Sequence, residues 1–208
     1  MVLTDDLFIN RGRVRLCYRH STRRELVVKV PAGSKSEQLK ANMKEYKGYH
    51  ELVRRHGLLA CISHCHGFTA TDRGDGLLCD CIRDEDGRIS RTIWEIIIHQ
   101  ADCDLDRVIS AVRKFCTYLV RHDIWIFDLN LKNIALRREL NGVYSPIVLD
   151  LKGRYDNQEF IPVSSHIGFF ARRKMARRTR QLLERIESFH ADRHRLQAEH
   201  QPMPQRGL

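Results

Sequence analysis

The Asn141-Gly142 dipeptide constrains the fold of this chain more than any other short segment. Asn-Gly favours the type I′ turn of a two-residue β-hairpin, because both residues tolerate a positive φ angle. Short β-type segments flank it at 134–138 and 143–149. The sequence therefore predicts that these two segments pair as antiparallel strands.

A two-residue turn also predicts the register of that hairpin. It pairs Leu140 with Val143, and counting outward then places Asn133 opposite Asp150. Facing residues in an antiparallel pair have Cβ atoms about 4.5–5.5 Å apart. Carboxylate and amide oxygens at that distance can share a divalent cation. We therefore expect a metal site formed by Asn133 and Asp150 at the open end of the hairpin.

The rest of the chain alternates between strand and helix patterns. The clearest helix is 105–121, with one apolar stripe through four turns and Asp104 in position to cap it. The other expected elements are strands at 14–19, 26–30, 61–68 and 76–82, helices at about 37–55 and 89–98, a β-type segment at 124–127, and a basic helix from 171. This order predicts an α+β fold with two lobes.

Composition is consistent with a packed domain. Of the 208 residues, 42% are hydrophobic, which is enough to bury a core. We expect an N-lobe at 1–82, a reduced and mainly helical C-lobe at 83–195, and a disordered tail at 196–208. The sequence has neither a long apolar run nor a signal-peptide pattern, so the expected location is the cytoplasm.

Four of the seven cysteines are close enough in sequence to raise the question of a metal site. Cys61 and Cys65 precede Cys79 and Cys81, and His64 lies between the first two. Their spacing matches no common zinc pattern, and the second pair falls in a predicted strand. The pattern favours buried structural thiols, with a metal site as the alternative.

Positive charge is concentrated in one segment. The net charge is +10, and 172–180 holds six cations in nine positions. Such a patch attracts phosphates, nucleic acid or anionic lipid head groups, although a solvated helix face explains it equally well. No recognition-helix or zinc-finger signature accompanies it, so an anionic partner at Arg172–Arg180 is expected to be something other than nucleic acid.

An Asp-x₄-Asn segment, Asp128 to Asn133, follows the long amphipathic helix. It resembles the catalytic loop of protein kinases and small-molecule phosphotransferases. The resemblance implies that Asp128 orients or deprotonates an acceptor hydroxyl, that Asn133 and Asp150 hold Mg²⁺, and that Lys132 can assist in catalysis.

The N-terminal half contains a lysine that matches this pattern. Lys29 lies in an apolar strand segment where kinases carry the lysine that contacts the α and β phosphates of ATP. Such a lysine needs a helix glutamate as partner. Glu45 lies roughly 70° from the centre of the apolar face of the 37–55 helix, whereas Glu51 points away from it. Glu45 is therefore the predicted partner.

Two further segments complete the expected nucleotide site. Gly12 and Arg13 occupy the position of a glycine-rich loop over the phosphates, although with one glycine instead of two or three. Asp80, Cys81 and Ile82 would form the hinge between the lobes, where backbone groups meet adenine in kinases.

Taken together, these motifs resemble the YrbL family, which are small kinase-like bacterial proteins linked to the PhoP regulatory network. The resemblance covers about residues 5–180. It is carried by Gly12 to Tyr18, Val28-Lys29-Val30, Glu45 to Tyr49, Asp84 to Gly87, and Asp128 to Leu136. It implies a kinase-like fold and a cytoplasmic location.

The sequence departs from protein kinases at several of these motifs. Ile126-Phe127 replaces the usual His-Arg, Asn130 replaces the usual lysine, and Asp150 is followed by Leu-Lys instead of Phe-Gly. The resulting hypothesis is an ATP- and Mg²⁺-dependent phosphotransferase with an unknown protein or saccharide acceptor. The alternative is a catalytically inactive pseudokinase that acts as a regulatory binding module.

Overall fold

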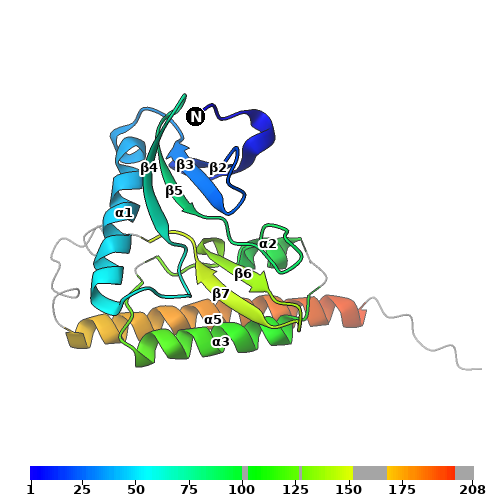
Figure 1. The fold of residues 1–208 in the computed structure, drawn as a ribbon. Coiled ribbons are helices and arrows are strands. Elements are labelled where there is room, and N and C mark those ends of the chain that lie inside the picture. The colour runs from blue at the N-terminus through cyan, green and yellow to red at the C-terminus, as the bar shows by residue number, and fades with distance from the viewer. Residues whose placement is uncertain (100–102, 127, 152–167, 200–208) are drawn as a thin grey trace, which may run out of the picture.

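The computed structural model describes residues 1–99, 103–126, 128–151 and 168–199 (Figure 1). Its first half is an antiparallel sheet of five strands in the order β1-β2-β3-β5-β4. Helix α1 (Ser36–His56) packs against β3, β4 and β5. The strands are β1 (Phe8–Arg11), β2 (Arg15–Arg19), β3 (Leu26–Pro31), β4 (Cys65–Thr71) and β5 (Gly74–Asp80).

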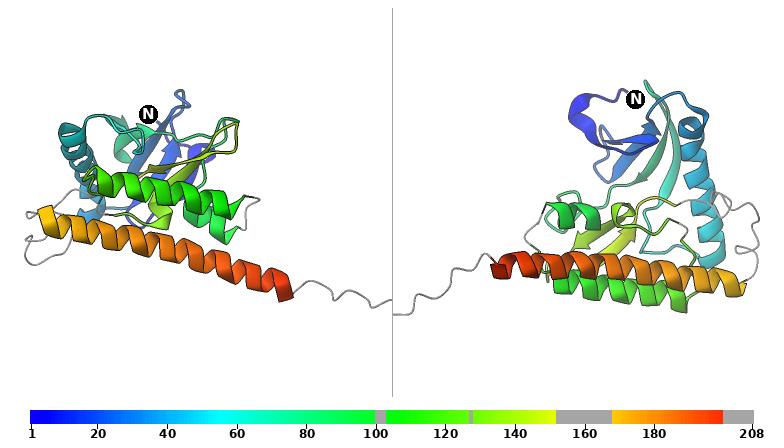
Figure 2. Two further views of the ribbon diagram at one scale, coloured as in Figure 1. Left: turned by 90° about the horizontal axis from the view of Figure 1, so that it is seen from below. Right: turned by 180° about the vertical axis from the view of Figure 1, so that it is seen from behind.

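The second half contains helices and one β-hairpin. Its elements are α2 (Ile93–Ile98), α3 (Leu105–Arg121), β6 (Ile134–Arg138), β7 (Tyr144–Val148) and α5 (Gly168–Glu199). Helices α3 and α5 lie side by side (Figure 2). They run antiparallel, since Asp123 pairs with Arg172 at 2.7 Å near one end and Asp106 with His190 at 3.8 Å near the other. The predicted α+β class is confirmed.

Helix α3 forms where its apolar stripe predicts it. The Asp104 carboxylate accepts a hydrogen bond from the Arg107 amide at 3.1 Å, which satisfies one of the free N–H groups of the first turn. The buried side chains of α3 repeat at three- and four-residue spacing and face the core. They are Leu105, Val108, Ile109, Val112, Phe115, Cys116 and Leu119.

The hairpin forms as predicted, but its register is shifted by one residue. The Gly142 amide donates to the Glu139 carbonyl at 2.9 Å, and the Glu139 amide donates to the Val143 carbonyl at 3.0 Å. Gly142 has a φ of 72°, so the loop is a three-residue turn with a glycine bulge. The predicted pairing of Asn133 with Asp150 is therefore wrong, and Leu149 lies opposite Asn133 instead.

Several other boundaries differ from the prediction. Strand β1 was not expected, because its four residues are mostly exposed at the sheet edge and have little apolar pattern. The expected helix at 89–98 begins only at Ile93, because Thr92 and Glu95 form a capping box there. Residues 124–126 form no strand, and Phe127 lies outside the described residues. The expected tail also begins too early, since α5 continues through 196–199.

The two halves share one hydrophobic core. Val148, the last residue of β7, donates its amide to the Cys61 carbonyl at 2.9 Å and accepts from the Ser63 amide at 2.8 Å. Buried Ile62 forms a parallel bridge with the same residue. The end of β7 is thereby fixed against the segment that leads into β4. Within the described ranges, no helix is both long enough and apolar enough to cross a bilayer.

Candidate functional site

Lys29 and Glu45 form a buried ion pair between the sheet and helix α1. Lys29 lies on β3, and its Nζ is 2.6 Å from Oε1 of Glu45. The side chains are 11% and 2% exposed, respectively. The structure therefore pairs Lys29 with the glutamate that the sequence favoured over Glu51.

The buried face of α1 is rotated from the one predicted. Leu39 and Met43 belong to the apolar face from which the position of Glu45 was predicted, yet they are exposed, whereas Asn42 and Glu45 are buried. The Asn42 side-chain amide donates to the Lys29 carbonyl at 2.7 Å and to the Asp75 carbonyl at 3.0 Å. These bonds hold α1 against β3 and β5, so Glu45 lies at the centre of the buried face and not on its flank.

Lys29 also connects the sheet to the end of the hairpin. Its ammonium group donates to the Leu149 carbonyl at 2.6 Å. The Leu149 amide in turn donates to the Asn133 carbonyl at 2.8 Å. Lys29, Asn133 and Asp150, which are far apart in the sequence, therefore meet around Leu149.

The Asp128 carboxylate is oriented by two asparagine amides. Asn130 donates to Oδ1 at 2.8 Å, and Asn133 donates to Oδ2 at 3.0 Å. Asn130 also accepts from the Lys132 amide at 3.0 Å, which caps the short 3-10 helix at Leu131–Asn133. Because the nitrogen of the Asn133 amide is directed to Asp128, its oxygen is the atom that could bind a cation.

Arg15, which was not among the predicted site residues, lies at the centre of this site. Its guanidinium bonds to Oε2 of Glu45 through Nη1, and its Nη2 lies 3.0 Å from Oδ1 of Asp150. The strand pairing contains the signal. Cys17 lies opposite Lys29, and Arg15 precedes Cys17 by two residues on β2, so Arg15 and Lys29 lie on the same face of the sheet. An arginine at that position reaches the same carboxylate as Lys29.

The charges of this cluster are balanced and fixed. Burial would lower the pKa of both Arg15 and Lys29, but neighbouring groups, including the Glu45 and Asp150 carboxylates, raise both above their ordinary values. Both side chains therefore remain cationic at any physiological pH. Burial raises the pKa of the Cys17 thiol to about 12, so this thiol stays protonated beside them.

The remaining predicted catalytic and phosphate-binding residues lie at the surface. Lys132 is exposed, and its Nζ lies 4.9 Å from the centre of the Trp94 ring on α2. Gly12 begins the turn between β1 and β2, where its amide donates to the Arg15 carbonyl at 2.8 Å. Exposed Arg13 pairs with Glu37 at 2.6 Å. Their roles in catalysis or phosphate binding stay predictions.

The expected hinge, 80–82, begins at the last residue of β5. The Cys81 amide donates to the Glu25 carbonyl at 2.8 Å, and the Ile82 carbonyl accepts from the Ser90 amide at 2.9 Å. The Asp80 carboxylate bonds to His66 at 2.6 Å. Two of the backbone groups that were expected to meet adenine, the Cys81 amide and the Ile82 carbonyl, therefore have partners within the protein.

Two of the clustered cysteines lie against Glu45. Cys65 and Cys79 face each other on β4 and β5 with their sulfur atoms 3.8 Å apart, and a Glu45 oxygen lies within 4.8 Å of both. The hydrogen bond with Cys79 and burial raise the pKa of Cys65 above its ordinary value. Zinc binds thiolates, and Glu45 is already neutralised by two cations. This geometry favours the structural interpretation of these cysteines.

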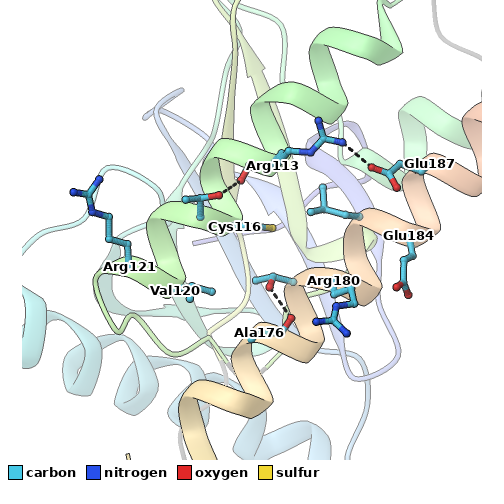
Figure 3. A pocket seen from close by; sticks show the side chains of 11 residues that line it. Arg113, Cys116, Val120, Arg121, Ala176, Arg180, Glu184 and Glu187 are labelled. Carbon is cyan, nitrogen blue, oxygen red and sulfur yellow. Dashed lines mark hydrogen bonds and ion pairs between the residues drawn. The ribbon is translucent and has the colours of Figure 1, made fainter. Parts of the chain in front are cut away.

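The basic segment begins near the start of α5, and part of it lines a surface groove between α3 and α5 (Figure 3). Arg172 is held by the Asp123 carboxylate through two bonds of 2.7 Å, whereas Arg173, Arg177 and Arg180 are exposed on one face of α5. The groove, with a volume of about 690 Å³, is lined by α3 and α5 residues, which include Arg180 of the basic segment but none of the residues predicted to bind the nucleotide or the metal.

The fold and the site define an α+β protein with a buried Lys29–Glu45 ion pair. Lys29 is also hydrogen-bonded to the end of the β-hairpin, next to the loop that orients Asp128. A family model described as "PhoP regulatory network protein YrbL" matches residues 1–187, so the chain belongs to the YrbL family. It is similar to "Uncharacterized protein YrbL" of Escherichia coli (strain K12), with 28% identity over 179 residues, or 84% of this chain and 82% of the relative. The same values apply to the protein of that name in Shigella flexneri.

Proposed function

We propose that this chain is a kinase-like, ATP- and Mg²⁺-dependent phosphotransferase that acts on a hydroxyl group of an unknown acceptor. The first support is the strand order β1-β2-β3-β5-β4, with a lysine on β3 and its glutamate partner on the following helix. This is the arrangement of lysine and glutamate in the protein-kinase template. The sheet with α1 would be the smaller lobe, and the second half would be a reduced larger lobe.

One observation carries the proposal: Lys29 bonds both to Glu45 and to the Leu149 carbonyl. The ammonium group has three N–H donors, so the identity of its second acceptor is the informative point. Lys29 also reaches Leu149, the residue before Asp150. Asn133 lies just before the β6–β7 hairpin, and Asp150 lies just after it. A phosphate group bound by Lys29 would therefore lie beside the two residues predicted to hold the metal.

The donor types at this site fit Mg²⁺. Asp150 is 24% exposed and offers a carboxylate, and Asn133 offers an amide oxygen. Bound there, Mg²⁺ would neutralise phosphate charge. Lys29 would exchange its bond with Leu149 for the phosphates. Asp128, held in place by Asn130 and Asn133, would accept the proton of the acceptor hydroxyl.

ATP with Mg²⁺ should raise the melting temperature of the protein, and the Lys29→Met variant should lose this effect. At an ATP concentration 100 times the Kd, binding stabilises the native state by about 2.7 kcal/mol. For a chain of this size, that corresponds to a rise of roughly 5–10 °C. A thermal-shift titration, with each variant compared with its own ligand-free form, measures the effect.

Lys47→Met, at an exposed position on α1, is the matched control and should respond like the wild type. Transfer of radiolabelled γ-phosphate to acceptors in cell lysate then tests turnover, which Asp150→Ala should abolish. No shift at millimolar ATP, or unchanged transfer by Asp150→Ala, would contradict the proposal.

Two observations favour the alternative of a pseudokinase that serves as a regulatory binding module. Arg15 is bonded to the carboxylate of Asp150, and the Cys81 amide in the expected hinge has a partner within the chain. On this alternative, the fold is retained and turnover is lost. Binding of ATP without any phosphoryl transfer, with or without Mg²⁺, would decide for it.

A further inference from the structure

The structure places a guanidinium where the proposed function needs a metal ion. Arg15 Nη2 lies 3.0 Å from Oδ1 of Asp150. The second arm of the same guanidinium bonds to Glu45. The Arg15 side chain is only 11% exposed, so this is a buried bridge between two carboxylates and not a mobile surface contact.

The charges in the cluster are already balanced. Lys29 and Arg15 contribute two positive charges, and Glu45 and Asp150 contribute two negative charges. A divalent cation on Asp150 would add two positive charges next to a guanidinium on the same carboxylate. Like charges at such short distances repel strongly in a partly buried site. The guanidinium therefore opposes the binding of a metal ion to Asp150 in this arrangement.

We propose that Arg15 competes with the divalent cation for Asp150 and thereby sets the metal affinity of the site. The cation binds only after the guanidinium leaves the carboxylate. A nucleoside triphosphate supplies a new anionic partner for the displaced guanidinium, so metal and nucleotide should bind cooperatively. This inference rests on the proposed function only in taking Asp150 as a metal ligand.

A purely structural role for Arg15 predicts something different. Buried ion pairs contribute little net stability, because desolvation offsets their attraction. If Arg15 served packing alone, its removal would alter stability without creating a metal site. Metal affinity therefore separates the two roles.

The test is a titration of the full chain with Mn²⁺ alone, monitored by the EPR signal of the free ion. Arg15→Met should bind Mn²⁺ at least about tenfold more tightly than the wild type, a change of about 1.4 kcal/mol. Arg19→Met, an exposed arginine on the same strand, removes the same charge and should leave the affinity unchanged. Adding Asp150→Asn to Arg15→Met should abolish the gain.

Equal affinity in the wild type and Arg15→Met would overturn the inference, as would a gain that survives Asp150→Asn or an equal gain in Arg19→Met. If circular dichroism shows that Arg15→Met is unfolded, Arg15→Gln, which keeps a polar group at the bridge, takes its place. The titration contains no nucleotide. A failure of ATP binding therefore bears on the proposed function, whereas unchanged Mn²⁺ affinity in a protein that still binds ATP bears on the competition between Arg15 and the cation at Asp150.

Discussion

Replacing Glu45 with glutamine should lower the free energy of unfolding by about 3–5 kcal/mol, the usual cost of removing one partner from a buried ion pair. Glutamine keeps the shape of the side chain but not its charge. Lys29 and Arg15 would then have Asp150 as the one remaining carboxylate of the cluster, and one buried positive charge would lack compensation. Urea denaturation monitored by circular dichroism measures the loss.

The same substitution at Glu51 provides the control. Glu51 is on the same helix but is partly exposed, so Glu51→Gln should change stability by no more than about 0.5 kcal/mol. Similar losses for the two variants would show that the cluster around Glu45 is not electrostatically coupled as described. A loss in Glu45→Gln that disappears when Lys29 is also changed to methionine would support the coupling.

Replacing Asp128 with asparagine should slow phosphoryl transfer by about 10²- to 10⁴-fold, on the proposed function. An amide cannot accept the proton of the acceptor hydroxyl. It also places a donor against Asn130 or Asn133, both of which donate to Asp128. The cost to folding should be only about 1 kcal/mol, because one hydrogen bond is lost. Single-turnover transfer of γ-phosphate measures the rate.

The rise in melting temperature with ATP should persist in Asp128→Asn, since Lys29 remains to bind the phosphates. Asp106→Asn, at a position whose side chain is 83% exposed, is the matched control and should transfer phosphate at the wild-type rate. A normal rate in Asp128→Asn would exclude Asp128 as the base. Loss of nucleotide binding in that variant would instead indicate a structural role for the loop.

Local patterns predicted the elements whose determinants lie within one segment. Helix α3 has a complete apolar stripe and its own cap at Asp104, and the structure agrees to the residue. The hairpin has its Asn-Gly signal. The predicted register was wrong, because the sequence alone did not show that Gly142 would form the bulge of a three-residue turn. A shift of one residue was enough to place Leu149 opposite Asn133.

The site was harder to predict, because its geometry depends on contacts between segments. Glu45 was chosen correctly as the partner of Lys29, but from an apolar face that is itself partly exposed. Hydrogen bonds from Asn42 determine the rotation of α1, and a hydropathy pattern does not register a buried asparagine. Arg15 was missed for a similar reason: a buried arginine looks like a surface residue until the strand pairing is known.

Asn42 has a consequence for how such a protein could be regulated. One side chain ties α1 to the backbone of both β3 and β5, so turning the helix outward would break two buried hydrogen bonds as well as the contact of Glu45 with Lys29. Control by a swinging helix is therefore energetically disfavoured here. Release of the β2 arginine from Asp150 would break fewer contacts, because it moves one side chain and leaves α1 in place.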